Sequence, residues 1–127
     1  MPFYSFYKFP NSYLDKDFLK RTTEIIEKHI DDPKFDIPTL CKEIGMSKTV
    51  LYAKFKALTD MTPNNYILSY KLKYSAAMLV KYPKMQIAEI SDQLGFGSAV
   101  YFTRCFKERY NTTPQNYRKN NSNHTTP

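Results

Sequence analysis

Apolar residues recur along this chain at the three- and four-residue spacing of helices that bury one face, and every convincing periodic segment follows that spacing. Residues 17–30, for example, place Phe18, Ile25, Ile26 and Ile30 near one face. Six further helices, counted together with their capping residues, are predicted over residues 39–44, 47–58, 62–81, 86–94, 98–110 and 113–119. The pattern predicts an all-α fold of about seven helices.

Capping residues mark where these helices begin. Serine and threonine side chains accept hydrogen bonds from the unpaired N–H groups of a first turn, and proline suits the first helical position. We assign this capping role to Thr39, Ser47, Thr62, Ser98 and Thr113. The buried face of the long middle helix is expected to carry Ile67, Tyr74 and Met78, with Leu72 and Leu79 beside it.

Residues 41–66 recur as residues 91–117 in an internal repeat. At an offset of 51 residues, Phe55-Lys56, Asp60, Thr62-Pro63 and Asn65-Tyr66 recur as Phe106-Lys107, Asn111, Thr113-Pro114 and Asn116-Tyr117. Upstream, Cys41 and Gly45 recur as Ser91 and Gly95 at an offset of 50, so one residue is added in the second turn. The chain therefore holds two copies of one unit, joined by the middle helix.

Each copy has the features of a helix-turn-helix. A short helix ends in a glycine, which permits a positive φ, and a serine-capped helix follows after a short turn. Cys41 and Ser91 provide the small residue four positions before that glycine, where the two helices cross closely. We predict helix-turn-helix units at about residues 39–58 and 86–110, and we call the second helix of each unit its recognition helix.

Charge distinguishes the two parts of the chain. Residues 1–36 hold six Lys or Arg against seven Asp or Glu, whereas residues 37–127 hold thirteen against five, so the net charges are −1 and +8. A compact segment of that sign attracts polyanions, although a basic surface that only aids solubility explains the charge equally well.

Other functional classes find little support. Cys41 and Cys105 are expected to be small buried residues, and His29 and His124 have no nucleophile or metal partner nearby, so no enzyme, metal site or cofactor is predicted. The longest uncharged stretch, residues 93–103, is far too short to span a membrane, and no signal peptide is visible. These features fit a reducing cytoplasm.

Several of these residues carry a family resemblance. Gly95-Phe96, Tyr101-Phe102, Arg104, Phe106-Lys107, Thr113-Pro114 and Tyr117-Arg118 resemble the signature of the AraC/XylS family's DNA-binding domain; Gly45-Met46-Ser47, Leu51, Phe55-Lys56 and Lys71-Leu72 match its first half. The segment with Asp15, Asp17, Phe18, Leu19, Lys20 and Ile25-Ile26-Glu27 is similar to the start of the C-terminal output domain in hybrid two-component system regulators of the Bacteroides type.

The resemblance implies seven helices in two subdomains, whose third and sixth helices enter successive major grooves of double-stranded DNA. It also implies contact with RNA polymerase, and it places a sensor or receiver domain elsewhere in a longer protein. Asp60 and Asn111 stand where the family usually has glycine, and we expect both to adopt the left-handed backbone that these residue types tolerate. Lys71 and Ala53 replace common arginines.

The candidate DNA contacts lie on the two recognition helices. In this motif the N-terminal half reaches base edges. We select Ser47, Lys48, Thr49, Tyr52 and Lys56 in the first unit, and Ser98, Ala99, Val100, Thr103, Arg104 and Lys107 in the second.

Their expected roles differ. Arg104 is a candidate for a bidentate guanine contact, with a phosphate contact or surface ion pair as its alternative, and Ala99 or Val100 suits a thymine methyl group. Tyr52 is as well explained as a residue at the edge of the core. Lys56 and Lys107 suit phosphate better than bases.

The prediction is thus a sequence-specific DNA-binding domain at residues 17–119 that regulates transcription. Residues 1–16, with an aromatic tract from Phe3 to Tyr13, are interpreted as a linker or N-terminal extension, with a packing or dimer contact as the alternative, and residues 120–127 as a disordered tail. The middle helix is expected to hold the recognition helices about one DNA turn apart, roughly 34 Å. The alternatives are a non-specific architectural DNA-binding protein and a helical protein-interaction domain.

Overall fold

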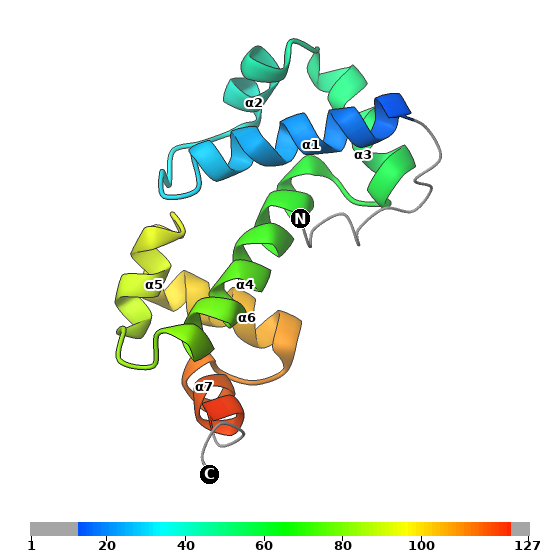
Figure 1. Ribbon diagram of the computed structural model, residues 1–127. Coiled ribbons are helices and arrows are strands. Elements are labelled where there is room, and N and C mark those ends of the chain that lie inside the picture. Colours follow the sequence, from blue (N-terminus) through cyan, green and yellow to red (C-terminus); the bar gives the residue numbers. More distant parts are fainter. Residues whose placement is uncertain (1–12, 123–127) are drawn as a thin grey trace. The chain divides into compact units, whose positions relative to one another are not determined.

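The computed structural model describes residues 13–122 and contains seven α-helices and no strand within that range (Figure 1). The helices are α1 (Tyr13–Lys28), α2 (Ile37–Ile44), α3 (Lys48–Thr59), α4 (Pro63–Lys81), α5 (Ile87–Gln93), α6 (Ala99–Tyr110) and α7 (Pro114–Ser122). The all-α prediction is confirmed. Helix α1 begins four residues before the predicted domain start, and α7 continues to Ser122 through part of the predicted disordered tail. Most of the aromatic tract, and His124, lie outside the described residues.

The chain forms two compact units. Within the described range, unit 1 comprises residues 13–29 and 34–70, and unit 2 comprises residues 30–33 and 71–122. Helix α4 contributes its first eight residues to unit 1 and the remainder to unit 2. Each unit contains one of the two predicted helix-turn-helix segments together with its own apolar core.

The core of unit 1 is built around Phe55 of α3, which is completely buried. Its ring makes edge contacts with Phe18 of α1, at 5.6 Å between centroids, and with Tyr66 of α4, at 5.1 Å. Leu19 of α1 and Leu40 of α2 are also completely buried. Of the apolar face predicted for the first helix, Phe18 and Ile26 are buried, Ile25 is half-buried, and Ile30 lies beyond the end of α1.

Helix α4 shows that one sequence-based expectation was wrong. Among its aromatic and aliphatic side chains, Tyr66 and Tyr70 in unit 1 and Leu72, Ala76 and Leu79 in unit 2 are buried, whereas Ile67 and Met78 are half-buried and Tyr74 is exposed. The two tyrosines can be buried because their hydroxyls find partners on α1. The Tyr66 hydroxyl lies 3.2 Å from Thr23 Oγ1, and the Tyr70 hydroxyl donates to the Glu27 carboxylate.

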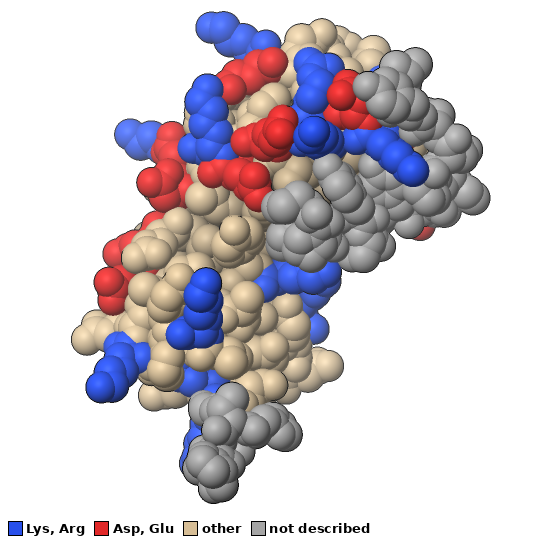
Figure 2. Space-filling model, viewed as in Figure 1, with Lys and Arg blue, Asp and Glu red and all other residues tan. Residues whose placement is uncertain are grey.

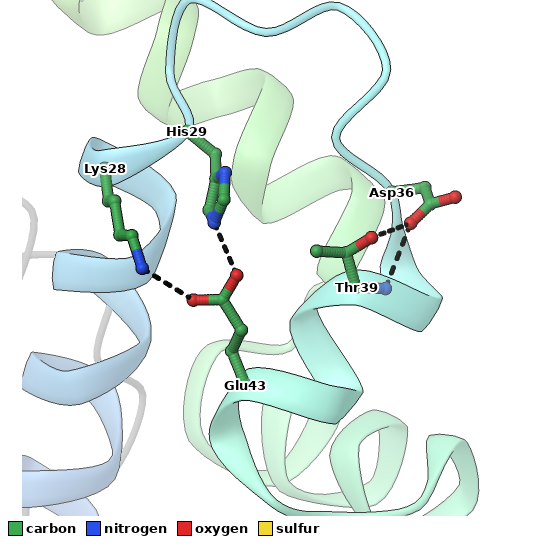
Figure 3. A network of polar contacts seen from close by, with 5 residues as sticks. All are labelled: Lys28, His29, Asp36, Thr39 and Glu43. Atoms are coloured by element: carbon green, nitrogen blue, oxygen red, sulfur yellow. Dashed lines mark hydrogen bonds and ion pairs between the residues drawn. The ribbon is translucent and has the colours of Figure 1, made fainter.

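Polar contacts connect the end of α1 with α2 (Figure 3). His29 Nε2 lies 2.6 Å from Glu43 Oε2, and Lys28 Nζ lies 3.4 Å from Glu43 Oε1. The His29 ring is also stacked on Phe35, with 4.7 Å between centroids. The hydrogen bond with His29 is the main reason that the pKa of Glu43 lies below its usual value. His29 therefore serves the fold, as the absence of a nucleophile beside it suggested.

The cap of α2 is Asp36 and not Thr39. Asp36 has extended backbone, with φ −136°, and its Oδ1 accepts from the Thr39 backbone N–H at 3.0 Å and from the Thr39 hydroxyl at 2.6 Å (Figure 3). The helix consequently begins at Ile37, with Pro38 in its first turn, where a missing N–H costs nothing.

Unit 2 repeats the design of unit 1 around Phe106 of α6. The Phe106 ring contacts Tyr110 at 4.5 Å, Phe102 at 5.8 Å and Tyr117 of α7 at 5.4 Å. Arg118 of α7 holds the end of α4, because its Nε donates to the Leu79 carbonyl at 2.8 Å and its Nη2 to the Tyr82 carbonyl at 3.1 Å. A cation at the C-terminus of a helix is placed favourably against the helix dipole.

Candidate nucleic-acid interface

The first predicted turn has the expected construction. Helix α2 ends at Gly45, whose φ of 78° is left-handed and whose N–H bonds to the Cys41 carbonyl. Helix α3 then begins after Ser47, whose hydroxyl accepts from the Val50 N–H at 3.3 Å. Cys41 is half-buried, so the expectation of a fully buried filler was wrong for this residue but correct for Cys105.

The second turn is one residue longer and has an additional hydrogen bond across it. Gly95 and Gly97 both have positive φ, 68° and 83°, so the added residue is accommodated by a second left-handed position. The Ser98 hydroxyl accepts from the Tyr101 N–H at 3.1 Å. Ser91, completely buried in α5, donates from its hydroxyl to the Ser98 carbonyl at 3.1 Å. Ser91 thus links the first helix of the unit to the cap of the second, a role that its small size alone did not reveal.

Gly95 is also a point of close approach. An added Cβ there would lie 2.7 Å from the carbonyl oxygen of Ile30 and 3.2 Å from the carbonyl carbons of Asp31 and Asp32, in the segment of unit 2 that precedes Pro33. Lys71 of α4 donates from Nζ to the Gly95 carbonyl at 3.2 Å, and burial lowers its pKa. Lys71 therefore stabilises the second turn through its hydrogen bond to the Gly95 carbonyl.

The C-terminal ends of the two recognition helices confirm another expectation. Asp60 after α3 and Asn111 after α6 have φ of 62° and 57°, and each backbone N–H bonds to the lysine carbonyl four residues earlier. Within the described residues they are the only non-glycine positions with positive φ. The repeat thus holds the same backbone geometry without the glycine usual in the family.

Exposure follows the repeat along α3 and α6. The inward positions are buried in both helices, as Leu51 and Phe55 in α3 and as Phe102 and Phe106 in α6. Outward positions are exposed in both helices: Ser47, Lys48, Thr49, Ala53 and Lys56 in the first, and Ser98, Val100, Arg104 and Lys107 in the second. Tyr52, Ala99 and Thr103 are half-buried. Each recognition helix therefore presents one face to solvent, and that face carries most of the predicted contact residues.

Two exposed residues on these faces were not among the contact residues predicted from the sequence. Val50 and Tyr101, which are equivalent in the repeat, are 45% and 40% exposed, and neighbouring Val100 reaches 78%. Their position three residues after a capping serine, in both copies, was the available signal.

Charges on the recognition helices differ from those on α1. Acidic and basic side chains mix over α1 on the face of unit 1 shown in Figure 2. Helix α3, by contrast, has three lysines and no acidic residue, and α6 has three cations and one acidic residue, Glu108. Lys56 lies 3.3 Å from Asp60 in an exposed ion pair, whereas the equivalent neighbour of Lys107 is the uncharged Asn111. Lys107 is thus the better placed of the two for phosphate.

Aromatic rings lie beside two of the predicted contact residues. Lys48 Nζ is 5.6 Å from the centre of the Tyr52 ring, and Arg104 Cζ is 5.4 Å from the centre of the Tyr101 ring. Hydrogen bonding to the Cys105 side chain, followed by burial, raises the pKa of Tyr101 above its usual value. Both cations are exposed, so they can also meet a ligand.

Neither a metal-binding cluster nor a membrane-spanning helix occurs in the described part of the chain. No group of three or more His, Cys, Asp or Glu side chains there is arranged to hold a metal ion. In residues 13–122, no helix combines the length and the apolar character that crossing a membrane requires.

Known proteins are similar to this chain in sequence and in fold. Residues 40–120 match a family model described as "Helix-turn-helix domain". Histidine kinase P4 of Formosa agariphila is 40% identical over 106 residues, which are 84% of this chain and 8% of that protein. Regulatory protein SoxS of Salmonella typhimurium is 31% identical over 103 residues, 81% of this chain and 94% of SoxS. The C-terminal domain of the two-component response regulator yesN from Fusobacterium nucleatum has a TM-score of 0.73 at 26% identity, covering 80% of this chain and 98% of that domain.

The chain belongs to the AraC-type helix-turn-helix family of DNA-binding transcription regulators. The predicted fold and family are thereby confirmed. The matched segment spans only a small fraction of the histidine kinase but nearly all of SoxS, so relatives carry this domain both within long chains and almost by itself.

Proposed function

We propose that α3 and α6 each enter a major groove of duplex DNA and that their exposed faces read the two parts of one binding site. The repeated exposure pattern carries this proposal, because the same positions after Ser47 and after Ser98 face solvent in both helices. In helix-turn-helix proteins the N-terminal residues of the second helix contact base edges. In this proposal residues 13–122 form the binding domain, and its helix-turn-helix segments lie at about residues 39–58 and 86–110.

The two helices offer different chemistry to the bases. Helix α3 presents Thr49, Val50 and Ala53, which supply methyl groups and one hydroxyl, and these suit thymine methyl groups. Helix α6 presents Val100 together with the forked donor of Arg104, which suits the O6 and N7 atoms of guanine. Discrimination between bases therefore rests more on α6 than on α3.

Phosphate contacts supply most of the affinity in this proposal. Lys107 on α6 and Lys48 at the start of α3 are exposed cations on the proposed DNA face. The starts of α3 and α6, beside Ser47 and Ser98, carry backbone N–H groups and the positive ends of the helix dipoles, which attract phosphate. Lys56 contributes less because Asp60 neutralises it.

The domain serves as the output part of a longer cytoplasmic regulator, in which a sensor or receiver lies outside these 127 residues. The similarity to a segment of a histidine kinase and to the C-terminal domain of a response regulator supports this assignment. Occupancy of a promoter would then recruit or obstruct RNA polymerase.

Paired substitutions on α6 test the proposal. A site selected from random duplex by the wild-type chain serves as the cognate DNA, and a scrambled duplex serves as the reference. Arg104→Ala should weaken cognate binding about tenfold or more, since a bidentate contact contributes about 1–3 kcal/mol of discrimination, and should leave scrambled DNA nearly unchanged. Lys107→Ala should weaken both alike and reduce the salt slope by about one unit.

Lys84→Ala is the matched control, because Lys84 is an exposed cation of unit 2 outside the recognition helices. It should lower both affinities less than Lys107→Ala does. If Arg104→Ala lowered cognate and scrambled binding by the same factor, Arg104 would contact phosphate only and the assignment of base recognition to it would be wrong.

A further inference from the structure

We propose that Tyr101 is a positioning residue for Arg104: its ring holds the guanidinium on the exposed face of α6 in an orientation suited to a base edge, and so contributes to sequence specificity. This inference rests on the proposed function, because it takes Arg104 to be a base-contacting residue. Tyr101 belongs to the family signature but is not among the DNA contacts predicted from the sequence.

The two side chains are neighbours on one helix face. Arg104 follows Tyr101 by three residues, a spacing that brings helical side chains together. The guanidinium carbon lies 5.4 Å from the centre of the Tyr101 ring, inside the range of about 6 Å for a cation–π contact. Both residues are exposed, so the pair faces solvent together.

The Tyr101 ring is itself held in place on several sides. It packs against Phe96 at 6.1 Å between centroids, and Phe96, only 7% exposed, packs in turn on Phe102 at 4.8 Å. The Tyr101 backbone N–H also bonds to Ser98 Oγ at 3.1 Å. The ring is therefore a fixed platform built from the second turn and from α6.

A fixed platform matters to an arginine in particular. A free arginine side chain loses considerable rotamer freedom when it is fixed on a base, and pre-ordering reduces that loss at the moment of binding. A guanidinium held over a ring face can still present its N–H groups for hydrogen bonds. On α3 the equivalent residues are Val50 and Ala53, so unit 1 has neither the ring nor the fork.

A double-mutant cycle tests the inference on the whole chain. Affinities for the selected cognate duplex and for scrambled duplex are measured for wild type, Tyr101→Leu, Arg104→Ala and the double variant. Tyr101→Leu should weaken cognate binding about two- to fivefold, the size expected for an exposed cation–π contact, and leave scrambled binding unchanged. In the Arg104→Ala background, Tyr101→Leu should have no further effect.

Two controls accompany the cycle. Tyr101→Phe keeps the ring and should bind cognate DNA as wild type does. Val50→Ala, at the equivalent position of α3, should lower cognate affinity by the same factor with and without Arg104, because Val50 has no arginine to orient. Melting temperatures by circular dichroism show whether a variant acts through stability.

Different failures have different meanings. An equal effect of Tyr101→Leu with and without Arg104 would overturn the positioning role, since Tyr101 would then contact DNA itself. Equal losses of melting temperature and affinity for the leucine and phenylalanine variants would overturn it as well, in favour of a structural role. If Arg104→Ala by itself left the preference for cognate DNA intact, the proposed base contact would fail first.

Discussion

Replacing the two turn glycines by alanine separates backbone strain from crowding. Gly45 and Gly95 have similar positive φ, 78° and 68°, so a side chain in either position pays for a left-handed backbone. That strain is about 1–2 kcal/mol for an ordinary residue. Their surroundings differ, because a Cβ on Gly45 would meet nothing within 4 Å, whereas one on Gly95 would lie 2.7 Å from the Ile30 carbonyl oxygen.

Gly95→Ala should therefore destabilise the fold more than Gly45→Ala does. Contact with backbone atoms cannot be relieved by a rotamer change, and overpacking of this kind costs about 1–3 kcal/mol. We expect a loss of about 1–2 kcal/mol for Gly45→Ala and about 2–5 kcal/mol for Gly95→Ala. Urea unfolding followed by circular dichroism measures both, with midpoints that differ by on the order of 1 M.

Asparagine variants isolate the two contributions. Asparagine tolerates left-handed backbone, as Asn111 does in this chain, so Gly45→Asn should recover most of the stability lost by Gly45→Ala. Gly95→Asn should recover little, because its Cβ still meets the segment before Pro33. Equal losses for Gly45→Ala and Gly95→Ala would refute the close approach of that segment to the second turn.

Three further predictions concern the caps, the acid limb of stability and the salt response. Ser47→Ala and Ser98→Ala should each lower the free energy of unfolding, measured in urea, by about 1 kcal/mol. Threonine at either position should retain most of that stability. An alanine variant as stable as wild type would contradict the capping geometry. The hydrogen bond with His29 lowers the pKa of Glu43 from 4.5, so the pair stabilises the fold above that pH and its contribution is lost as pH falls through the lowered pKa. Glu43→Gln should therefore flatten the acid side of the curve of stability against pH, and an unchanged curve would count against the contact. Duplex affinity should fall about a hundredfold or more between about 50 and 200 mM salt, for about five to eight phosphate contacts, and a flat response in fluorescence anisotropy would contradict the electrostatic argument.

Local signals in the sequence were enough to predict most of the fold. Apolar spacing and capping residues located all seven helices, and the family resemblance, which has glycine at these positions, predicted left-handed backbone at Asp60 and Asn111. These features depend on residues that lie within one or two turns of each other. The internal repeat placed equivalent contact candidates on the outer faces of α3 and α6, although the exposed Val50 and Tyr101 were not among them.

The errors arose where distant residues decide the outcome. The buried side of α4 changes between the two units, from Tyr66 and Tyr70 to Leu72 and Ala76, so no single stripe runs along the helix. The burial of those tyrosines depends on hydroxyl partners 43 residues earlier in the chain. The cap of α2 was misplaced because Pro38 looked like a break before Thr39, whereas Asp36 starts the helix ahead of it.

Footprinting on a selected site tests the central claim most directly. Hydroxyl-radical cleavage of a duplex chosen from random sequence by the whole chain reports which backbone positions the bound protein covers. Two recognition helices in adjacent grooves predict two protected blocks about ten base pairs apart on one face of the duplex. Arg104→Ala should weaken the block bound by α6 before the other. A single short block, or uniform protection without a preferred sequence, would contradict recognition of DNA by two helices.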